Sequence, residues 1–311
     1  AGTQPVPRPY WIGDFRNGDF CQFATVFQST SVNPNMSSSG YLRTCPQYTP
    51  YARDPSQRVH LTKRPRPPAL TPSRWASHQE VRTTDGPWFA GNSTDKATIR
   101  LTTEQTLNGA FRMGSVRWFR VSFYLPNPGF NWPASSWYTL MDLHHAVADP
   151  TGHNSPSIRM TVTPTNGNRR YLALSLDGTR ARANYEEVRL FQLTRIDGSR
   201  ILPLRNRPGQ RQRPRSPRPI APFNRWHTLV LGLRFSDQGR IGDSPGWVRI
   251  YLDGKRVYSK ARPNVWANET SLWLQLQNYK DHGAAFVGGA TSSIIHFADA
   301  RAGYTLASVS R

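Results

Sequence analysis

The sequence is poor in acidic side chains, in cysteine and in long apolar runs, and each shortage narrows what the chain can be. It has 19 Asp and Glu against 40 Lys and Arg, for a formal net charge of +21. No apolar run approaches the roughly 20 residues that cross a bilayer, so no transmembrane helix is predicted. Aromatic residues make up 12% of the chain, which is enough to build a packed core.

The motifs of several enzyme classes are also missing. No G-x-S-x-G sequence marks a serine nucleophile, and no glycine-rich loop followed by Lys could hold a phosphate. A glycosidase needs two facing carboxyl groups, whereas the adjacent Glu186 and Glu187 would diverge on a strand. His144 and His145 would diverge in the same way, and no nearby Cys or Glu completes a zinc site.

The two cysteines, Cys21 and Cys45, leave two alternatives open. A disulfide between them would stabilise the fold by about 3 kcal/mol and would indicate an oxidising compartment. Two buried free thiols are the other reading. No signal peptide is visible, and the opening "AGTQPVPRPYW" is compatible with the mature end of a secreted protein.

Alternating apolar and polar residues dominate the chain, and helical periodicity is scarce. The clearest element is 247–260, in which two alternating runs flank Asp253-Gly254, a pair typical of a type I′ hairpin turn. Further strands are predicted at 116–126, 137–144, 171–178, 227–235, 271–283 and 292–304. The pattern predicts one all-β domain over 1–311, a β-sandwich or jelly roll of antiparallel sheets.

Two segments interrupt this pattern. Residues 46–74 are rich in proline and read as an irregular loop. Residues 205–219, "RNRPGQRQRPRSPRP", contain no apolar side chain and predict an exposed insertion rich in Arg and Pro. This insertion is either a cationic arm that binds a polyanion or a solvated loop without a partner.

The stretch "SLWLQLQNYKDHG" (271–283) has two different faces. Its leucines suit a hydrophobic core, and the alternate residues are Trp273, Gln275, Gln277 and Tyr279. An aromatic ring can stack on a sugar and an amide can bind its hydroxyl or carboxylate groups, so this face is a candidate carbohydrate site. The alternative is an ordinary outer sheet face with scattered aromatic residues.

Several blocks, taken in order, resemble the secreted β-jelly-roll polysaccharide lyases of the heparin lyase I and glucuronan lyase type. They are "YWIGDFRNGDFCQF", "RWFRVSFYLP", "WYTLMDLHH" followed by "SPSIRM", "NRWHTLVLGLRFSDQGRIGDSPGWVRIYLDGKRV" and "SLWLQLQNYK" followed by "TSSIIHFADARAG". The resemblance runs from residue 10 to 304. It implies a concanavalin A-like sandwich whose concave sheet forms a substrate groove, and β-elimination on a uronic acid.

That reaction needs a group that neutralises the C5 carboxylate, a base for the C5 proton and an acid for the leaving oxygen. The resemblance places His144 at the family's histidine and Tyr279 at its tyrosine, with Lys280 after it. We therefore predict Tyr279 as the acid, and also as a candidate base. His144 is predicted as the base or the neutralising group. Lys280 is predicted as a substrate-binding residue and as a candidate to lower the pKa of Tyr279.

The sequence departs from the family pattern at positions that bear on substrate binding. Asp142 stands where an amide is common, and Gln277 replaces a glycine. No clear R-x-E-L strand is found, and Arg100, Glu104 and Arg112 are its nearest candidates. The neutralising residue is therefore unassigned, and its competing candidates are Gln275, Gln277, Asn154, Arg100 and His145.

The leading hypothesis is a secreted, monomeric lyase acting on an anionic polysaccharide such as glucuronan, alginate or a glycosaminoglycan. No cofactor is required, although a structural calcium ion is conceivable with Asp299 as a ligand. The alternatives are a non-catalytic carbohydrate-binding jelly roll and a glycoside hydrolase on the same scaffold. No membrane partner is expected. Nucleic acid fits the charge, but no motif for it is present.

Overall fold

The computed structural model describes residues 7–28, 45, 47–69, 71–87, 94–146, 156–164, 170–178, 185–193, 222–237 and 246–310. Within them the chain is almost entirely β-structure. The short helices are η2 (Thr49–Tyr51), α1 (Thr103–Leu107), η3 (Val287–Gly289) and α2 (Leu306–Ser310). None of the described helices combines the length and the apolar character needed to span a bilayer.

The strands form two antiparallel sheets. The eight-stranded sheet has the order β13-β12-β11-β6-β15-β4-β3, and β1 pairs with β15. Its strands are β1 (Trp11–Gly13), β3 (Val59–Thr62), β4 (Ala76–Arg82), β6 (Val116–Tyr124), β11 (Trp226–Arg234), β12 (Trp247–Leu252), β13 (Lys255–Ala261) and β15 (Ser292–Gly303).

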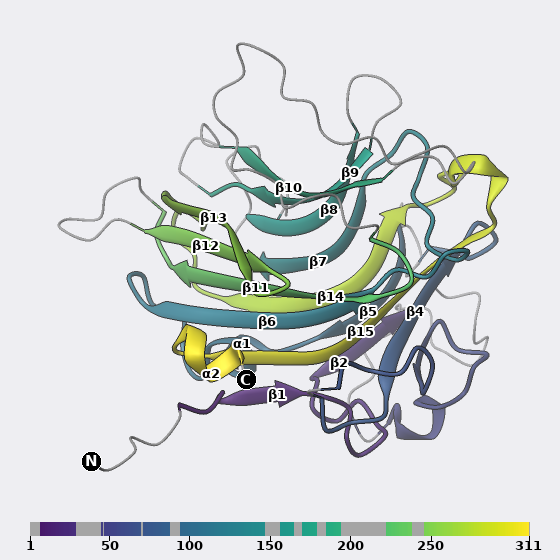
Figure 1. Ribbon diagram of the computed structural model, residues 1–311, viewed down its shortest axis with the longest axis horizontal. Coiled ribbons are helices and arrows are strands. Elements are labelled where there is room, and N and C mark those ends of the chain that lie inside the picture. The colour runs from purple at the N-terminus through teal and green to yellow at the C-terminus, as the bar shows by residue number, and fades with distance from the viewer. Residues whose placement is uncertain are drawn as a thin grey trace.

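The seven-stranded sheet has the order β10-β9-β8-β7-β14-β5-β2. Its strands are β2 (Thr25–Gln28), β5 (Thr94–Arg100), β7 (Tyr138–His145), β8 (Ile158–Pro164), β9 (Arg170–Leu176), β10 (Glu186–Leu193) and β14 (Leu272–Asp281). Figure 1 shows β10 and β13 at the top of the molecule and β1 and β2 at the bottom, with β7 and β14 bent along their length.

One hydrophobic core lies between the sheets, and the period-two pattern accounts for it. Leu272, Leu274 and Leu276 of β14 belong to this core, as predicted from the leucine face of the 271–283 stretch. Burying each leucine contributes about 1.5–3 kcal/mol. The alternate residues of β14 are therefore on the other side of the sheet, which we call the polar face.

The hairpin between β12 and β13 is also confirmed. Asp253 and Gly254 have positive φ values of 49° and 77°, as a type I′ turn requires at both central positions. Leu252 pairs with Lys255 across the turn. The turn therefore fixes the register of the edge of the eight-stranded sheet.

Two predicted loop segments have different outcomes. The 46–74 segment is not irregular throughout, because it contains η2 and β3. Val59 and Leu61 of β3 enter the core, a short alternation that the surrounding prolines obscure. The 205–219 insertion lies outside the described residues.

The predicted disulfide between Cys21 and Cys45 is present, with the two Cα atoms 4.9 Å apart. It links the segment after β1 to the segment before η2. The reading of two free thiols is therefore wrong.

Candidate active site

Residues of neighbouring strands line up in two rows across the polar face. In the first row, Gln275 of β14 pairs with Arg100 of β5 and with Asp142 of β7. The row continues through Arg159 of β8, Ser175 of β9 and Glu187 of β10. Residues at paired positions on antiparallel strands share a face, so these polar side chains form one continuous strip.

In the second row, Tyr279 of β14 pairs with Lys96 of β5 and with Thr139 of β7. The row continues through Thr161, Ala173 and Arg189. Lys96 therefore belongs to the second row, on β5, a strand that the sequence analysis does not predict. Its signal was the alternation of Lys96, Thr98 and Arg100 with the apolar Ala97 and Ile99.

Asp142 is at the centre of the polar face and is only 2% exposed. Its Oδ1 accepts a hydrogen bond from Gln275 Nε2 at 3.1 Å, and its Oδ2 accepts one from Gln277 Nε2 at 2.5 Å. Burial raises the pKa of the Asp142 carboxyl to about 6, against the opposing effect of the Lys96 charge and the amide hydrogen bonds. The two glutamines proposed as carboxylate ligands are therefore already engaged by a carboxylate of the protein.

Lys96 connects this centre to Tyr279. Its Nζ donates to Gln275 Oε1 at 3.4 Å and lies 4.8 Å from the centroid of the Tyr279 ring. Burial, helped by the Arg100 charge, lowers the pKa of Lys96 to about 8, although the Asp142 charge acts in the opposite direction. At neutral pH Lys96 is therefore mostly an ammonium ion that is poorly hydrated.

Tyr279 is partly buried at one end of this cluster. Its ring packs edge-on against Trp137, with centroids 4.7 Å apart. Burial raises the pKa of the Tyr279 hydroxyl above its usual value, although a hydrogen bond with Thr94 partly opposes the rise. The phenol therefore keeps its proton at neutral pH, which suits an acid more than a base.

His144 is at the other end of the cluster. Its ring stacks on Trp273 with centroids 5.1 Å apart, and the Arg100 guanidinium is 5.4 Å from the Trp273 ring centroid. His144 Nδ1 is 3.0 Å from the carbonyl oxygen of His145, which can only accept a hydrogen bond. Nδ1 therefore carries the hydrogen and Nε2 has the lone pair.

The same surroundings decide the charge of His144. Burial, together with the nearby Lys96 charge, lowers the pKa of His144 to about 4. A neutral imidazole with a free lone pair can accept a proton, but it cannot neutralise a carboxylate. Of the two roles predicted for His144, its electrostatic environment favours the base.

The register separates His144 from Tyr279. His144 pairs with Trp273, whereas Tyr279 pairs with Thr139, five residues along β7. At about 3.3 Å per residue, their backbones are about 16 Å apart along the strand. Lys96, Gln275 and Asp142 lie between them, so the two residues are at the ends of one cluster and not in contact.

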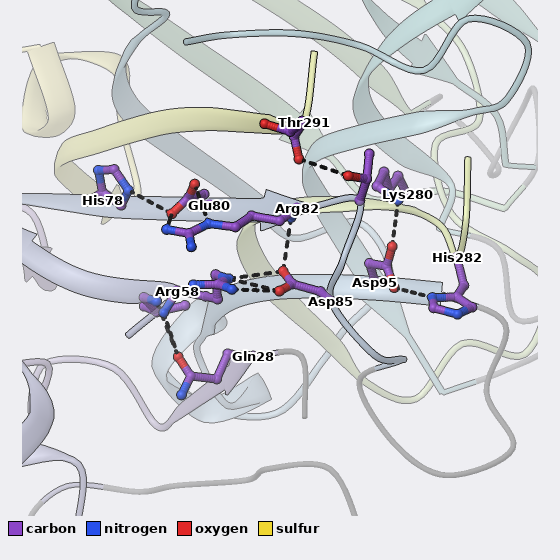
Figure 2. A network of polar contacts seen from close by, with 12 residues as sticks. Gln28, Arg58, His78, Glu80, Arg82, Asp85, Asp95, Lys280, His282 and Thr291 are labelled. Carbon is purple, nitrogen blue, oxygen red and sulfur yellow. Dashed lines mark hydrogen bonds and ion pairs between the residues drawn. The ribbon is translucent and has the colours of Figure 1, made fainter. Parts of the chain in front are cut away.

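Two predicted substrate-binding residues do not face this site. Lys280 is fully buried, and its Nζ binds Asp95 Oδ2 at 2.5 Å on the core side of the sheet. Figure 2 shows Lys280 and His282 converging on Asp95. The prediction for Lys280 is wrong because the Lys280 side chain alternates with that of Tyr279 and is on the same face as the leucines.

The prediction for His145 is also wrong, because this residue alternates with His144 and therefore faces the core. It is 0% exposed, its Nε2 accepts a hydrogen bond from the Ser157 backbone, and its Nδ1 lies 3.4 Å from Glu269 Oε2. The remaining candidate, Asn154, lies outside the described residues. Gln275, Gln277, Arg100 and Trp273 are all on the polar face.

The described residues do not fit the suggested calcium site. Asp299 binds Arg301 Nε through Oδ1 at 2.7 Å and faces Arg120 through Oδ2 at 2.9 Å. The positive charges of two guanidinium groups therefore lie against its two oxygens. In the described part of the chain, no three His, Cys, Asp or Glu side chains gather as a metal site requires.

Comparison with known proteins identifies a family. A family model described as "Polysaccharide lyase" matches residues 57–300. No curated protein matches the sequence.

Solved structures share the fold at low sequence identity. An endo-β-1,4-glucuronan lyase from the fungus Trichoderma reesei has a TM-score of 0.55 at 13% identity, covering 97% of this chain and 98% of that one. An alginate lyase from Pseudomonas aeruginosa has a TM-score of 0.52 at 8% identity, covering 90% and 98%. The alginate lyase from Klebsiella pneumoniae has a TM-score of 0.50 at 8% identity, covering 90% and 94%. They are jelly-roll sandwiches, which agrees with the two antiparallel sheets described above.

Proposed function

Because the chain belongs to the polysaccharide lyase family, we propose that it cleaves a polysaccharide containing uronic acids by β-elimination at the polar face. The observation that carries this proposal is the order of three groups along the face. A protonated Tyr279 and a neutral His144 flank the Lys96 ammonium ion, which is 7% exposed. These are the acid, base and cation that the reaction needs.

The roles follow from the charges. The Lys96 ammonium ion binds the C5 carboxylate and makes the C5 proton more acidic. Its electrostatic effect is larger than in water because the site excludes water. The backbones of His144 and Tyr279 are about 16 Å apart along β7, so both side chains must extend toward Lys96 to reach the same sugar ring. His144 Nε2 then takes the C5 proton, the C4–C5 double bond forms and the C4–O bond breaks. The Tyr279 hydroxyl gives its proton to the departing oxygen. Solvent then returns His144 and Tyr279 to their starting states.

The net charge of +21 supports an anionic polymer as the substrate, because it concentrates polyanions near the surface. The structural neighbours act on glucuronan and alginate, as their names state. Polymers of glucuronate, mannuronate or guluronate are therefore the first to test. The disulfide supports a location outside the cell, where disulfides persist.

The test is a panel of polyuronates incubated with the wild-type protein and with Tyr279→Phe. Elimination leaves a conjugated unsaturated uronate that absorbs ultraviolet light, so absorbance should rise for at least one polymer. Loss of the acid should lower the rate by about 10²–10⁴-fold in Tyr279→Phe, and loss of the base should do the same in His144→Ala.

Two results would contradict the proposal. Polymer retention without any cleavage would indicate a carbohydrate-binding module. Cleavage without new absorbance would indicate a hydrolase.

A further inference from the structure

Asp142 raises a charge problem for any uronate that binds to the polar face. Lys96 and Asp142 act on each other electrostatically, and each shifts the pKa of the other toward its charged form. Gln275 bridges them, because its Oε1 accepts a hydrogen bond from Lys96 Nζ and its Nε2 donates one to Asp142 Oδ1. One ammonium ion thus already balances one carboxylate before a substrate carboxylate arrives.

The other charged groups around Asp142 do not remove this problem. Arg159 faces it from β8 and lowers its pKa less than Lys96 does. Arg100 lies across β14 and is held between the rings of Phe27 and Trp273, at 4.9 Å and 5.4 Å. The neutral His144, the protonated Tyr279 and Asp281 are also on this face, as are the more distant Glu187 and Arg189.

We propose that Asp142 takes up one proton when a uronate binds, and so releases the charge of Lys96 for the substrate. Asp142 is then a positioning residue that couples substrate binding to protonation. The inference rests on the proposed function in one respect, which is that the ligand carries a carboxylate.

Physical considerations support this coupling. When a second carboxylate comes near a buried one, their repulsion raises the pKa of one of them, so that this group binds a proton. Other sites in which two carboxyl groups share a proton behave in this way. Asp142 is 2% exposed and cannot be screened by water. Its pKa of about 6 in the free protein leaves it mostly ionised at neutral pH, so there is a proton to gain.

The experiment measures proton uptake directly. Oligomers of whichever polyuronate the wild-type protein cleaves are titrated into Tyr279→Phe, which binds but turns over slowly, in two buffers of different ionisation enthalpy at pH 7. The dependence of the binding heat on the buffer should show uptake of about one proton. The Kd should rise by about tenfold per pH unit between pH 6 and pH 7.5.

Asp142→Asn and Glu187→Gln, each combined with Tyr279→Phe, assign the proton. The introduced amide has nearly the same shape as the Asp142 carboxyl but cannot titrate, so uptake and the pH dependence of Kd should both disappear. Glu187 is on the same row and is the matched control, so its substitution should leave the uptake unchanged. If Asp142→Asn does not fold, the carboxyl carbon shift of Asp142 in the ¹³C-labelled protein should report its protonation with and without the oligomer.

The outcomes separate this inference from the proposed function. Binding and cleavage without proton uptake would overturn the inference alone. Uptake that persists in Asp142→Asn, or a ¹³C signal of Asp142 that does not change, would overturn it too. If no polyuronate is bound or cleaved, the proposed function itself fails.

Discussion

Two lysine–aspartate pairs lie on opposite faces of the same sheet, and they differ in how their charges are arranged. On the core side, Lys280 Nζ contacts Asp95 Oδ2 directly at 2.5 Å, and His282 Nδ1 is 2.7 Å from Asp95 Oδ1. On the polar face, Lys96 and Asp142 are bridged by Gln275.

This difference in contact indicates that the core pair is structural and that the pair on the polar face is reactive. A direct, fully buried ion pair satisfies its own charges and has little left to offer a ligand. The bridged pair has shifted pKa values at both ends, about 8 for Lys96 and about 6 for Asp142. Groups with such shifts cluster at functional sites.

The largest effect should come from breaking the core pair. Lys280→Met leaves the Asp95 carboxylate buried beside His282 alone, which should cost about 3–5 kcal/mol of unfolding free energy, measured by urea denaturation. The double variant Lys280→Met with Asp95→Asn should recover much of this loss. Equal stability of the wild type and Lys280→Met would show that the pair is not structural.

Breaking the bridged pair should affect activity and not stability. Lys96→Met removes the charge that binds the substrate carboxylate, so kcat/KM should fall by about 10²–10³-fold. Unfolding free energy should change little, because Asp142 can take up a proton. A Lys96→Met protein with full activity would remove Lys96 from the reaction.

The pH dependence of kcat/KM tests the role of Lys96, and the expected effect is smaller. Asp142 loses its proton above pH 6 and Lys96 loses its charge above pH 8, so kcat/KM should fall with pH in two steps. Each step should steepen the fall by about tenfold per pH unit. Arg keeps its charge in this range, so Lys96→Arg should lack only the step near pH 8. Identical profiles for the two proteins would contradict the assignment.

The sequence predicts the parts of the molecule that depend on local pattern. The leucine face of β14 and the Asp253-Gly254 turn follow from alternation and turn chemistry. The same alternation places Lys280 with the leucines, and its assignment to the substrate side came from its place after Tyr279 in the family motif. His145 is adjacent to His144 on β7, so it faces the core and not the polar face.

The central cluster could not be predicted because it depends on long-range pairing. Lys96 and Gln275 meet only because β5 pairs with β14, a contact between segments far apart in the chain. The segment "TDKATIR" is polar enough to hide its alternation, so β5 was missed. The place of Asp142 opposite Gln275 likewise follows from the register of β7 and β14.

The most direct test of the account is the fate of water during cleavage. A polyuronate is degraded in water labelled with ¹⁸O, and the masses of the fragments are measured by mass spectrometry. Elimination breaks the chain without adding water, so neither new end should acquire the label at the moment of cleavage, and one fragment should carry the unsaturated uronate. Incorporation of one labelled oxygen at each cleavage would show hydrolysis and would contradict the roles given to Tyr279, His144 and Lys96.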